Sequence, residues 1–138
     1  MALLEKQLVI KRSQIPGAGK GLYTKKLIPK GTKIVEYKGK VTSWKEADHR
    51  DGANGYIYYV KRHHVLDAFP RTKAIARYAN DARGFNKIKG MTNNSEYIEE
   101  GLRVFIYSLK EIPAGGEILV GYGKEYWDVM KDNKKNGF

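Results

Sequence analysis

Short runs of strand-forming residues, each closed by a turn signal, are the feature that most limits how this 138-residue chain can fold. These runs cover residues 7–11, 33–37, 56–60, 64–67, 101–109 and 117–122. Helix signals are confined to the short stretches 43–50, 72–78 and 124–131. The first of them opens with Ser43 and Glu46 at the spacing of a capping box. The pattern predicts a mainly β protein with a few short helices.

Length and composition limit the class of protein. A chain of 138 residues with 41% hydrophobic and 30% charged residues is expected to form one globular domain over 1–138. No apolar run approaches the roughly 18 residues that cross a bilayer, and no secretory signal precedes Arg12, so we expect an intracellular protein without a membrane partner. The chain has no cysteine, which excludes disulfides, thiolate zinc sites and a cysteine nucleophile.

The positive charge is concentrated in the first third of the chain. The formal net charge is +11, and residues 1–45 hold eleven basic residues against two acidic ones, Glu5 and Glu36. Such a segment attracts polyanions, so residues 1–45 predict a possible contact with nucleic acid. An ordinary solvated surface explains the same charge equally well, and both interpretations stay open.

Two familiar patterns fail on inspection. The segment Gly17–Gly21 (GAGKG) resembles a phosphate-binding loop, but Gln14 stands where the first glycine is needed and Gly21 where serine or threonine is needed. The histidines His63 and His64 are adjacent, so in a strand they point to opposite faces, and His49 is the only other one. We expect no metal site.

Two turns of similar sequence stand far apart in the chain. Residues 27–31 (LIPKG) and 111–115 (EIPAG) each place proline second and glycine fourth in a turn, and each precedes a predicted strand. The residues alone indicate only two similar turns.

Four segments taken together resemble one protein family. They are Gly17–Tyr23 (GAGKGLY), Glu36–Gly39 (EYKG), Ala76–Asp81 (ARYAND) and Gly116–Gly123 (GEILVGYG). Their order and spacing resemble the SET-domain protein lysine methyltransferases, from about Leu8 to Trp127, with 128–138 as a C-terminal tail. The resemblance implies the SET-domain fold, with several small β-sheets around a knot-like core in which the third and fourth segments thread past each other. Such threading is rare among folds.

The resemblance also implies an activity and a methyl donor. SET-domain enzymes transfer a methyl group from S-adenosylmethionine to a lysine side chain of a protein, leaving S-adenosylhomocysteine, and they need no metal. The amine must lose its proton before it can react, and a narrow dry channel favours that loss. Aromatic walls suit such a channel, because they guide the alkyl chain and tolerate a cation.

Three tyrosines match the family's catalytic positions. Tyr122 matches the near-universal catalytic tyrosine, while Tyr37 and Tyr97 match positions that line the lysine channel. Tyrosine is also common in half-buried strands, so each of the three has a purely structural interpretation.

Other residues match positions that hold the methyl donor. Asn80 matches the asparagine that binds it, and Asp81 stands where the family usually has histidine, so a hydrogen bond near the cofactor must be made differently. Tyr56 and Trp127 are candidate walls for its amino-acid end and its adenine. The remaining candidates would lay their backbone along it; they are Ala18, Gly19, Lys20 and Gly21. A plain turn and ordinary packing are the structural alternatives.

The chain departs from the family's pattern in two further places. The stretch before Asn94, which matches a structural asparagine, is longer, with an extra loop over 82–92 whose function the sequence does not give. Zinc modules that complete the channel in many relatives are absent, so we expect 124–138, with Tyr126 and Trp127, to close the site.

Two function classes therefore remain. One is a lysine methyltransferase, either with a protein substrate that is held on nucleic acid or with a channel entry lined by Glu96, Glu99 and Glu100. A solvated acidic patch is the structural alternative for these three glutamates. The alternative is a non-catalytic SET-like module that binds nucleic acid through its basic N-terminal lobe.

Overall fold

Small antiparallel sheets make up most of the computed structural model, which describes residues 3–46, 56–61, 63–70, 74–82 and 91–122. One sheet pairs β1 (Leu8–Arg12) with β2 (Lys20–Thr24). A second has the order β3 (Lys33–Glu36), β8 (Arg103–Ser108), β7 (Ser95–Glu100), and a third the order β4 (Lys40–Thr42), β6 (His64–Asp67), β5 (Ile57–Lys61). The 3₁₀ helices η1 (Glu5–Gln7) and η3 (Ile75–Tyr78) complete these elements. The prediction of a mainly β fold is confirmed.

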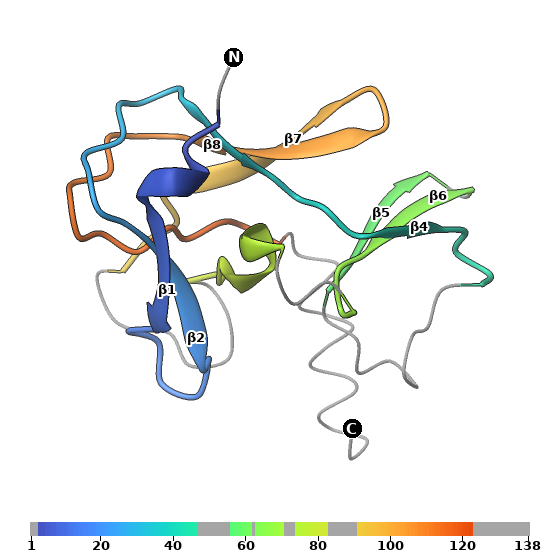
Figure 1. Cartoon of the computed structure of the whole chain (residues 1–138), viewed down its shortest axis with the longest axis horizontal. Coiled ribbons are helices and arrows are strands. Elements are labelled where there is room, and N and C mark those ends of the chain that lie inside the picture. Colours follow the sequence, from blue (N-terminus) through green and yellow to red (C-terminus); the bar gives the residue numbers. More distant parts are fainter. Residues whose placement is uncertain (1–2, 47–55, 62, 71–73, 83–90, 123–138) are drawn as a thin grey trace.

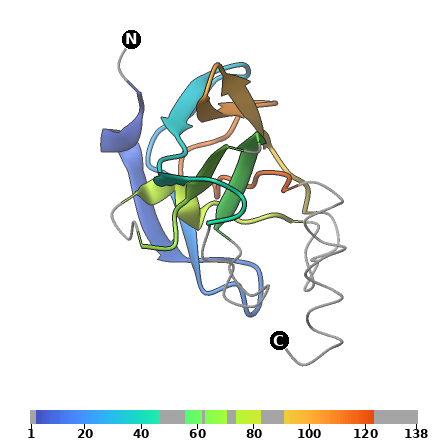
Figure 2. The ribbon, with the colours of Figure 1, turned by 90° about the vertical axis from the view of Figure 1, so that its right-hand side faces the viewer.

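The three sheets surround the middle of the molecule. The β1–β2 hairpin and the β4-β6-β5 sheet lie on opposite sides of η3, with β7 and β8 above them (Figure 1). The side view gives the same arrangement, with the β4-β6-β5 sheet toward the viewer (Figure 2). Strand β8 is the centre of its sheet, and its Val104 and Ile106 are completely buried against Ile34 of β3. Burying each such side chain contributes about 1.5–3 kcal/mol.

The segment 117–122 was predicted as a strand, and this prediction is wrong. It forms single bridges to three different segments, Tyr23↔Glu117, Asn80↔Leu119 and Ser95↔Val120, rather than a ladder with one partner. Its consecutive residues 117–120 are all buried, because the segment runs among the sheets in both views (Figures 1 and 2). This threading brings residue 80 beside residue 119, as the knot-like core requires.

The two similar turns of the sequence lie against each other. Ile28 and Ile112 exchange both backbone hydrogen bonds, at 2.8 and 2.9 Å. Gly31 and Gly115 close the two turns with φ angles of 77° and 83°, which glycine adopts without strain. The two copies of this short sequence therefore form two turns that pair with each other through their backbones.

Strand prediction missed β2, β4 and β7, whose sequences carry glycine, lysine or glutamate instead of a clear apolar pattern. Of the predicted helix over 72–78, residues 75–78 form η3, and 72–73 lie outside the described residues. At 43–46 the chain turns, with the Glu46 backbone N–H donating to Ser43 Oγ at 3.2 Å. The stretch 47–50 and the predicted helix over 124–131 lie outside the described residues. None of the described helices is long and apolar enough to span a membrane.

Gly39, the residue before β4, lies very close to the backbone of β6. A Cβ at this position would lie 2.8 Å from the carbonyl carbon of Asp67 and 2.9 Å from its amide nitrogen, both backbone atoms of the central strand. We expect Gly39→Ala to destabilise the protein by about 1–3 kcal/mol, the usual cost of overpacking. Thermal unfolding checks this against Lys38→Ala, a change at an exposed neighbour, and equal midpoints for the two variants would contradict the close approach.

Candidate active site

Four tyrosines from four separate segments form one aromatic cluster. Tyr37 follows β3, Tyr58 lies on β5, Tyr97 on β7, and Tyr122 at the end of the threaded segment. The ring centre of Tyr97 lies 5.7 Å from that of Tyr37, 5.2 Å from that of Tyr58 and 6.4 Å from that of Tyr122. The first two contacts are edge-to-face and the third is stacked, arrangements that aromatic rings favour. The structure thus brings the three predicted catalytic tyrosines together.

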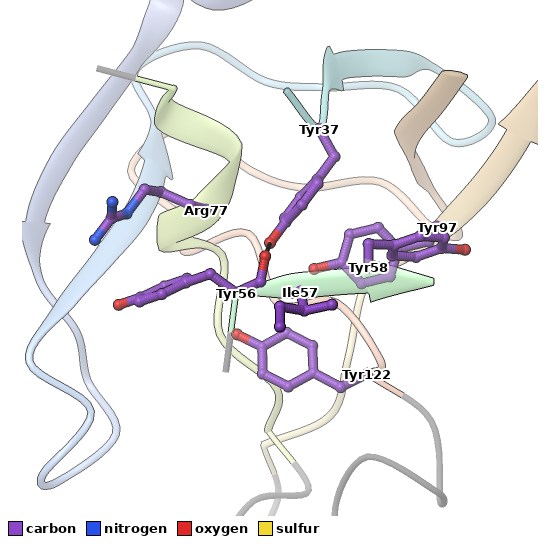
Figure 3. Close-up of a pocket in the computed structure, with 7 residues that line it drawn as sticks. All are labelled: Tyr37, Tyr56, Ile57, Tyr58, Arg77, Tyr97 and Tyr122. Atoms are coloured by element: carbon purple, nitrogen blue, oxygen red, sulfur yellow. Dashed lines mark hydrogen bonds between the residues drawn. The ribbon is translucent and has the colours of Figure 1, made fainter. Parts of the chain in front are cut away.

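This cluster lines a narrow pocket of about 40 Å³. Figure 3 shows its lining, Tyr37 reaching from one side and Tyr122 from the other. The lining residues are Tyr37, Tyr56, Ile57, Tyr58, Arg77, Tyr97 and Tyr122. A space of this size has room for about one water molecule or the end of an alkyl chain. The walls are mostly aromatic, with hydroxyl groups as the polar atoms.

Hydrogen bonds fix the upper wall of the pocket. The Tyr37 hydroxyl donates to the Tyr56 carbonyl oxygen at 2.7 Å, the contact drawn in Figure 3. The ring of Tyr56 lies 4.3 Å from the Arg77 guanidinium carbon. That guanidinium donates to the carbonyls of Ala68 and Phe69 at 2.9 and 2.7 Å, which ties η3 to the end of β6. Tyr56, predicted as a wall of the cofactor site, therefore also lines the tyrosine pocket.

Tyr122 is held at both ends by one short segment. Its hydroxyl donates to the Ala79 carbonyl, and its backbone N–H donates to Asp81 Oδ2 at 2.8 Å. The buried Asp81 carboxylate also accepts from Asn93 Nδ2 at 2.9 Å. The side chain of Asp81, predicted to bind the cofactor, thus contacts the backbone of Tyr122, and a cofactor contact of its own stays a prediction.

Burial changes the acidity of Tyr58, a wall residue that the sequence did not single out. Desolvation of the ring, followed by the nearby Glu99 carboxylate, raises the pKa of its hydroxyl from 10.0 to about 12. Glu99 is therefore the glutamate of β7 that lies beside the pocket, on the strand face of Tyr97. Glu100, on the opposite strand face, is committed to an ion pair with Lys33 at 2.8 Å.

The raised pKa predicts alkaline behaviour. The folded protein holds the Tyr58 proton more tightly than the unfolded chain, so this contribution to stability is present below about pH 10 and is lost as the pH rises toward about 12. We expect the ultraviolet tyrosinate titration of the native protein, minus that of Tyr58→Phe, to have its midpoint near pH 12. A midpoint near 10 would show that this hydroxyl is not buried.

A second group of candidate residues meets at the tip of the β1–β2 hairpin. Gly17 and Gly19 adopt φ angles of 80° and 74° in this turn, and Ser13 N donates to the Gly19 carbonyl at 2.7 Å. Asn80 Nδ2 donates to the Lys20 carbonyl at 3.0 Å and to Glu117 Oε2 at 3.5 Å. The predicted cofactor residues 18–21 and Asn80 therefore lie together. The Val120 backbone N–H donates to the Asn80 carbonyl at 2.9 Å, which connects this group to the segment that ends at Tyr122.

The remaining predicted residues lie outside the two groups described above or outside the described part of the chain. Asn94 is structural, since its side chain donates to the Glu117 carbonyl at 2.8 Å and accepts from Leu119 N at 3.0 Å. Trp127 and Tyr126, and most of the loop 82–92, lie outside the described residues. The sequence did not point to Tyr58, Arg77 or Glu117. In the described part of the chain, histidine, aspartate and glutamate nowhere gather in a group that could hold a metal ion.

Comparison with known proteins bears on the family and the fold of this chain. The pattern of the SET domain family matches residues 19–123. Among solved structures, the fold is similar to the methyltransferase domain of human PR domain-containing protein 2, with a TM-score of 0.63 at 24% sequence identity. That likeness covers 85% of this chain and 77% of the human one. Because the family pattern takes in more than half of the sequence, from the hairpin tip to Tyr122, this chain belongs to the SET-domain family.

Proposed function

We propose that the protein is an S-adenosylmethionine-dependent protein lysine N-methyltransferase. One observation carries the proposal: the Tyr122 hydroxyl, in the tyrosine pocket, donates to the carbonyl of Ala79, the residue before Asn80. The pocket suited to an amine and the group suited to a methyl donor therefore adjoin at residues 79–80. Membership of the SET-domain family supports a methyltransferase of that type.

The residues at the hairpin tip fit a ligand with an ammonium group. Both amide hydrogens of Asn80 have oxygen acceptors, so its Oδ1 is the atom left to accept a hydrogen bond, and no described residue donates to it. Among the described residues other than its two chain neighbours, none has a heavy atom within 4 Å of where a Cβ at Gly19 would be, which leaves space beside the backbone. Asn80 and the backbone of 18–21 would hold S-adenosylmethionine, with Tyr56 and Trp127 as proposed walls. When bound, it supplies a methyl group on a sulfonium and leaves S-adenosylhomocysteine.

The pocket residues prepare the lysine for reaction. An aromatic pocket with little room for water disfavours an ammonium ion, so the pKa of an entering lysine falls and the neutral nucleophile is favoured. The Tyr122 hydroxyl gives its hydrogen to Ala79, which turns its oxygen into the acceptor proposed for weak C–H···O contacts with a methyl group. Tyr37 and Tyr97 hold the alkyl chain in line, and alignment of the reactants is a large part of the rate enhancement.

Calorimetric titration with S-adenosylmethionine tests the proposal. We expect one binding site with a Kd near micromolar, displaced by S-adenosylhomocysteine. A wild-type protein that binds neither compound would contradict the proposed cofactor.

A second candidate function rests on the charge of the N-terminal part. Seven basic side chains between residues 6 and 30 are exposed, and within the described residues none forms an ion pair. They are Lys6, Lys11, Arg12, Lys20, Lys25, Lys26 and Lys30, of which Lys6, Lys25 and Lys26 line one groove. This surface suits nucleic acid, either as the whole function or as the means of reaching a protein substrate held on nucleic acid.

Salt dependence tests the nucleic-acid function. Bound duplex DNA would lose affinity steeply with salt, with log K falling about 0.9 per phosphate contact per decade of salt. Fluorescence anisotropy measures it, with Lys25→Glu/Lys26→Glu as the variant. Affinity that does not depend on salt, or on these two lysines, would exclude this surface.

A further inference from the structure

Glu117 is a buried carboxylate that the proposed chemistry does not use. It is 3% exposed, and glutamate is almost never so deeply buried unless its oxygens are bound. It begins the threaded segment, five residues before Tyr122, and forms a bridge with Tyr23 of β2. The position of this carboxylate between the hairpin and the threaded segment requires an explanation.

Both oxygens of the carboxylate are bound by uncharged donors. Oε1 accepts from the backbone N–H of Gln14 at 3.0 Å, and Oε2 accepts from Ser13 Oγ at 2.6 Å and from Asn80 Nδ2 at 3.5 Å. The described residues form no ion pair with it. Glu117 therefore links the hairpin turn to Asn80, two segments that are more than 60 residues apart.

The glycine at position 21 leaves room for this carboxylate. A Cβ at Gly21 would lie 2.3 Å from Glu117 Oε2 and 3.1 Å from the Ser13 Cβ. Real Cβ atoms essentially never lie closer than 3.0 Å to another heavy atom, so any other residue at position 21 would displace the carboxylate or the turn. Gly21 was predicted to contact the cofactor through its backbone. The contact with Glu117 gives a second, structural explanation for a glycine at this position.

The chemistry of the acceptors decides which way the Asn80 amide faces. A carboxylate oxygen and a carbonyl oxygen only accept hydrogen bonds, so the NH₂ group of Asn80 must face Glu117 and Lys20. The amide oxygen is then turned toward the space beside the hairpin tip. A side chain that offered a donor at position 117 would oppose this orientation and leave the Lys20 carbonyl alone to favour it.

We propose that Glu117 is a positioning residue for the methyl-donor site: its carboxylate orients the amide of Asn80 so that the amide oxygen accepts a hydrogen bond from the ligand. The proposal rests on the proposed function, because it assumes that Asn80 binds the donor. Glu117 acts on the ligand through Asn80 and does not touch it.

Glu117→Gln tests the proposal with little change in shape. The Gln14 N–H needs an acceptor, so the new amide turns its NH₂ toward Ser13 and Asn80, where two NH₂ groups then oppose each other. We expect S-adenosylhomocysteine, used as the probe in calorimetry, to bind about tenfold more weakly than to the wild type, the effect of losing one hydrogen bond of ordinary strength. Glu111→Gln, the same change at an exposed glutamate without a described hydrogen bond, is the matched control and is expected to leave Kd unchanged.

A double-mutant cycle separates positioning from general loosening. If Glu117 acts through Asn80, Glu117→Gln weakens binding in the wild type and has no further effect when Asn80 is already alanine. Equal effects in both backgrounds would overturn the proposal, as would an unchanged Kd in Glu117→Gln. If the wild type binds no probe at all, the proposed function itself fails, which is a different result from the loss of coupling.

A measurement on the wild type covers the case in which Glu117→Gln does not fold. The two side-chain amide hydrogens of Asn80 give separate NMR signals, and bonds to two acceptors slow their exchange with water. We expect both signals to exchange several times more slowly than those of an exposed asparagine side chain. Exchange at the exposed rate would overturn the orientation that Glu117 is proposed to impose.

Discussion

Tyr122→Phe is expected to lower methyl transfer by about 100-fold while leaving the affinity for S-adenosylmethionine nearly unchanged. The change removes only the hydroxyl, which the structure bonds to the Ala79 carbonyl, and keeps the ring stacked on Tyr97. Without this oxygen, Tyr122 can neither polarise the methyl group nor hold its side of the pocket against the Ala79 carbonyl. Transfer of labelled methyl to lysate proteins gives the rate, and calorimetry gives the affinity.

The matched control is Tyr59→Phe. Tyr59 neighbours Tyr58 on β5, but it is 53% exposed and its ring contacts Trp44 outside the tyrosine cluster. Its hydroxyl is therefore expected to be dispensable for transfer. Full activity in Tyr122→Phe, or an equal loss in both variants, would remove Tyr122 from the proposed catalytic role.

Asn80→Ala is expected to weaken S-adenosylmethionine binding by about 1–3 kcal/mol, which is about 5- to 150-fold. The variant loses the free amide oxygen proposed to bind the donor, together with the contacts to Lys20 and Glu117. Calorimetric titration at one temperature measures the difference in Kd.

Asn80→Asp distinguishes the roles of the two amide atoms. It keeps an oxygen toward the ligand but sets a second oxygen against the Glu117 carboxylate and the Lys20 carbonyl, where only a donor fits. We therefore expect it to bind weakly as well. Wild-type affinity in Asn80→Ala would show that the donor lies elsewhere.

Local sequence pattern was sufficient for strands that pair along their whole length. His64–Asp67 was predicted with its observed bounds, because this strand is the centre of its sheet and its apolar run is buried on that account. The segment 117–122 has an equally apolar pattern, yet it meets Tyr23, Asn80 and Ser95 one at a time. A pattern records that a residue is buried and says nothing of how many partners bury it.

The same limit explains which site residues the sequence could give. Tyr37, Tyr122 and Asn80 stood in motifs that resemble a family, and Tyr97 matched a position of that family outside the motifs. The structure gathers these tyrosines around one pocket. Tyr58 stood among three tyrosines of 56–59, and only pairing with β6 places it, rather than Tyr59, inside. Alternation along the strand would have separated the two faces without saying which one lies inward.

The burial of Glu117 could not be predicted from the sequence, for a different physical reason. An acidic residue after two glycines ordinarily belongs to an exposed turn, and its burial depends on donors from Ser13, Gln14 and Asn80. Those donors come from two segments that no local pattern connects. Asp81 is similar, since its bond to the Tyr122 backbone depends on the threading of two distant segments.

The most direct test of the central claim is methyl transfer by the wild-type protein. The protein is incubated with S-adenosylmethionine that carries an isotope-labelled methyl group and with a cell lysate, and mass spectrometry locates the label. The proposed function predicts labelled methyl on lysine side chains, at levels that Tyr122→Phe reduces by about 100-fold. Absence of label on lysine, or the same labelling by wild type and Tyr122→Phe, would contradict a lysine methyltransferase that works through this tyrosine pocket.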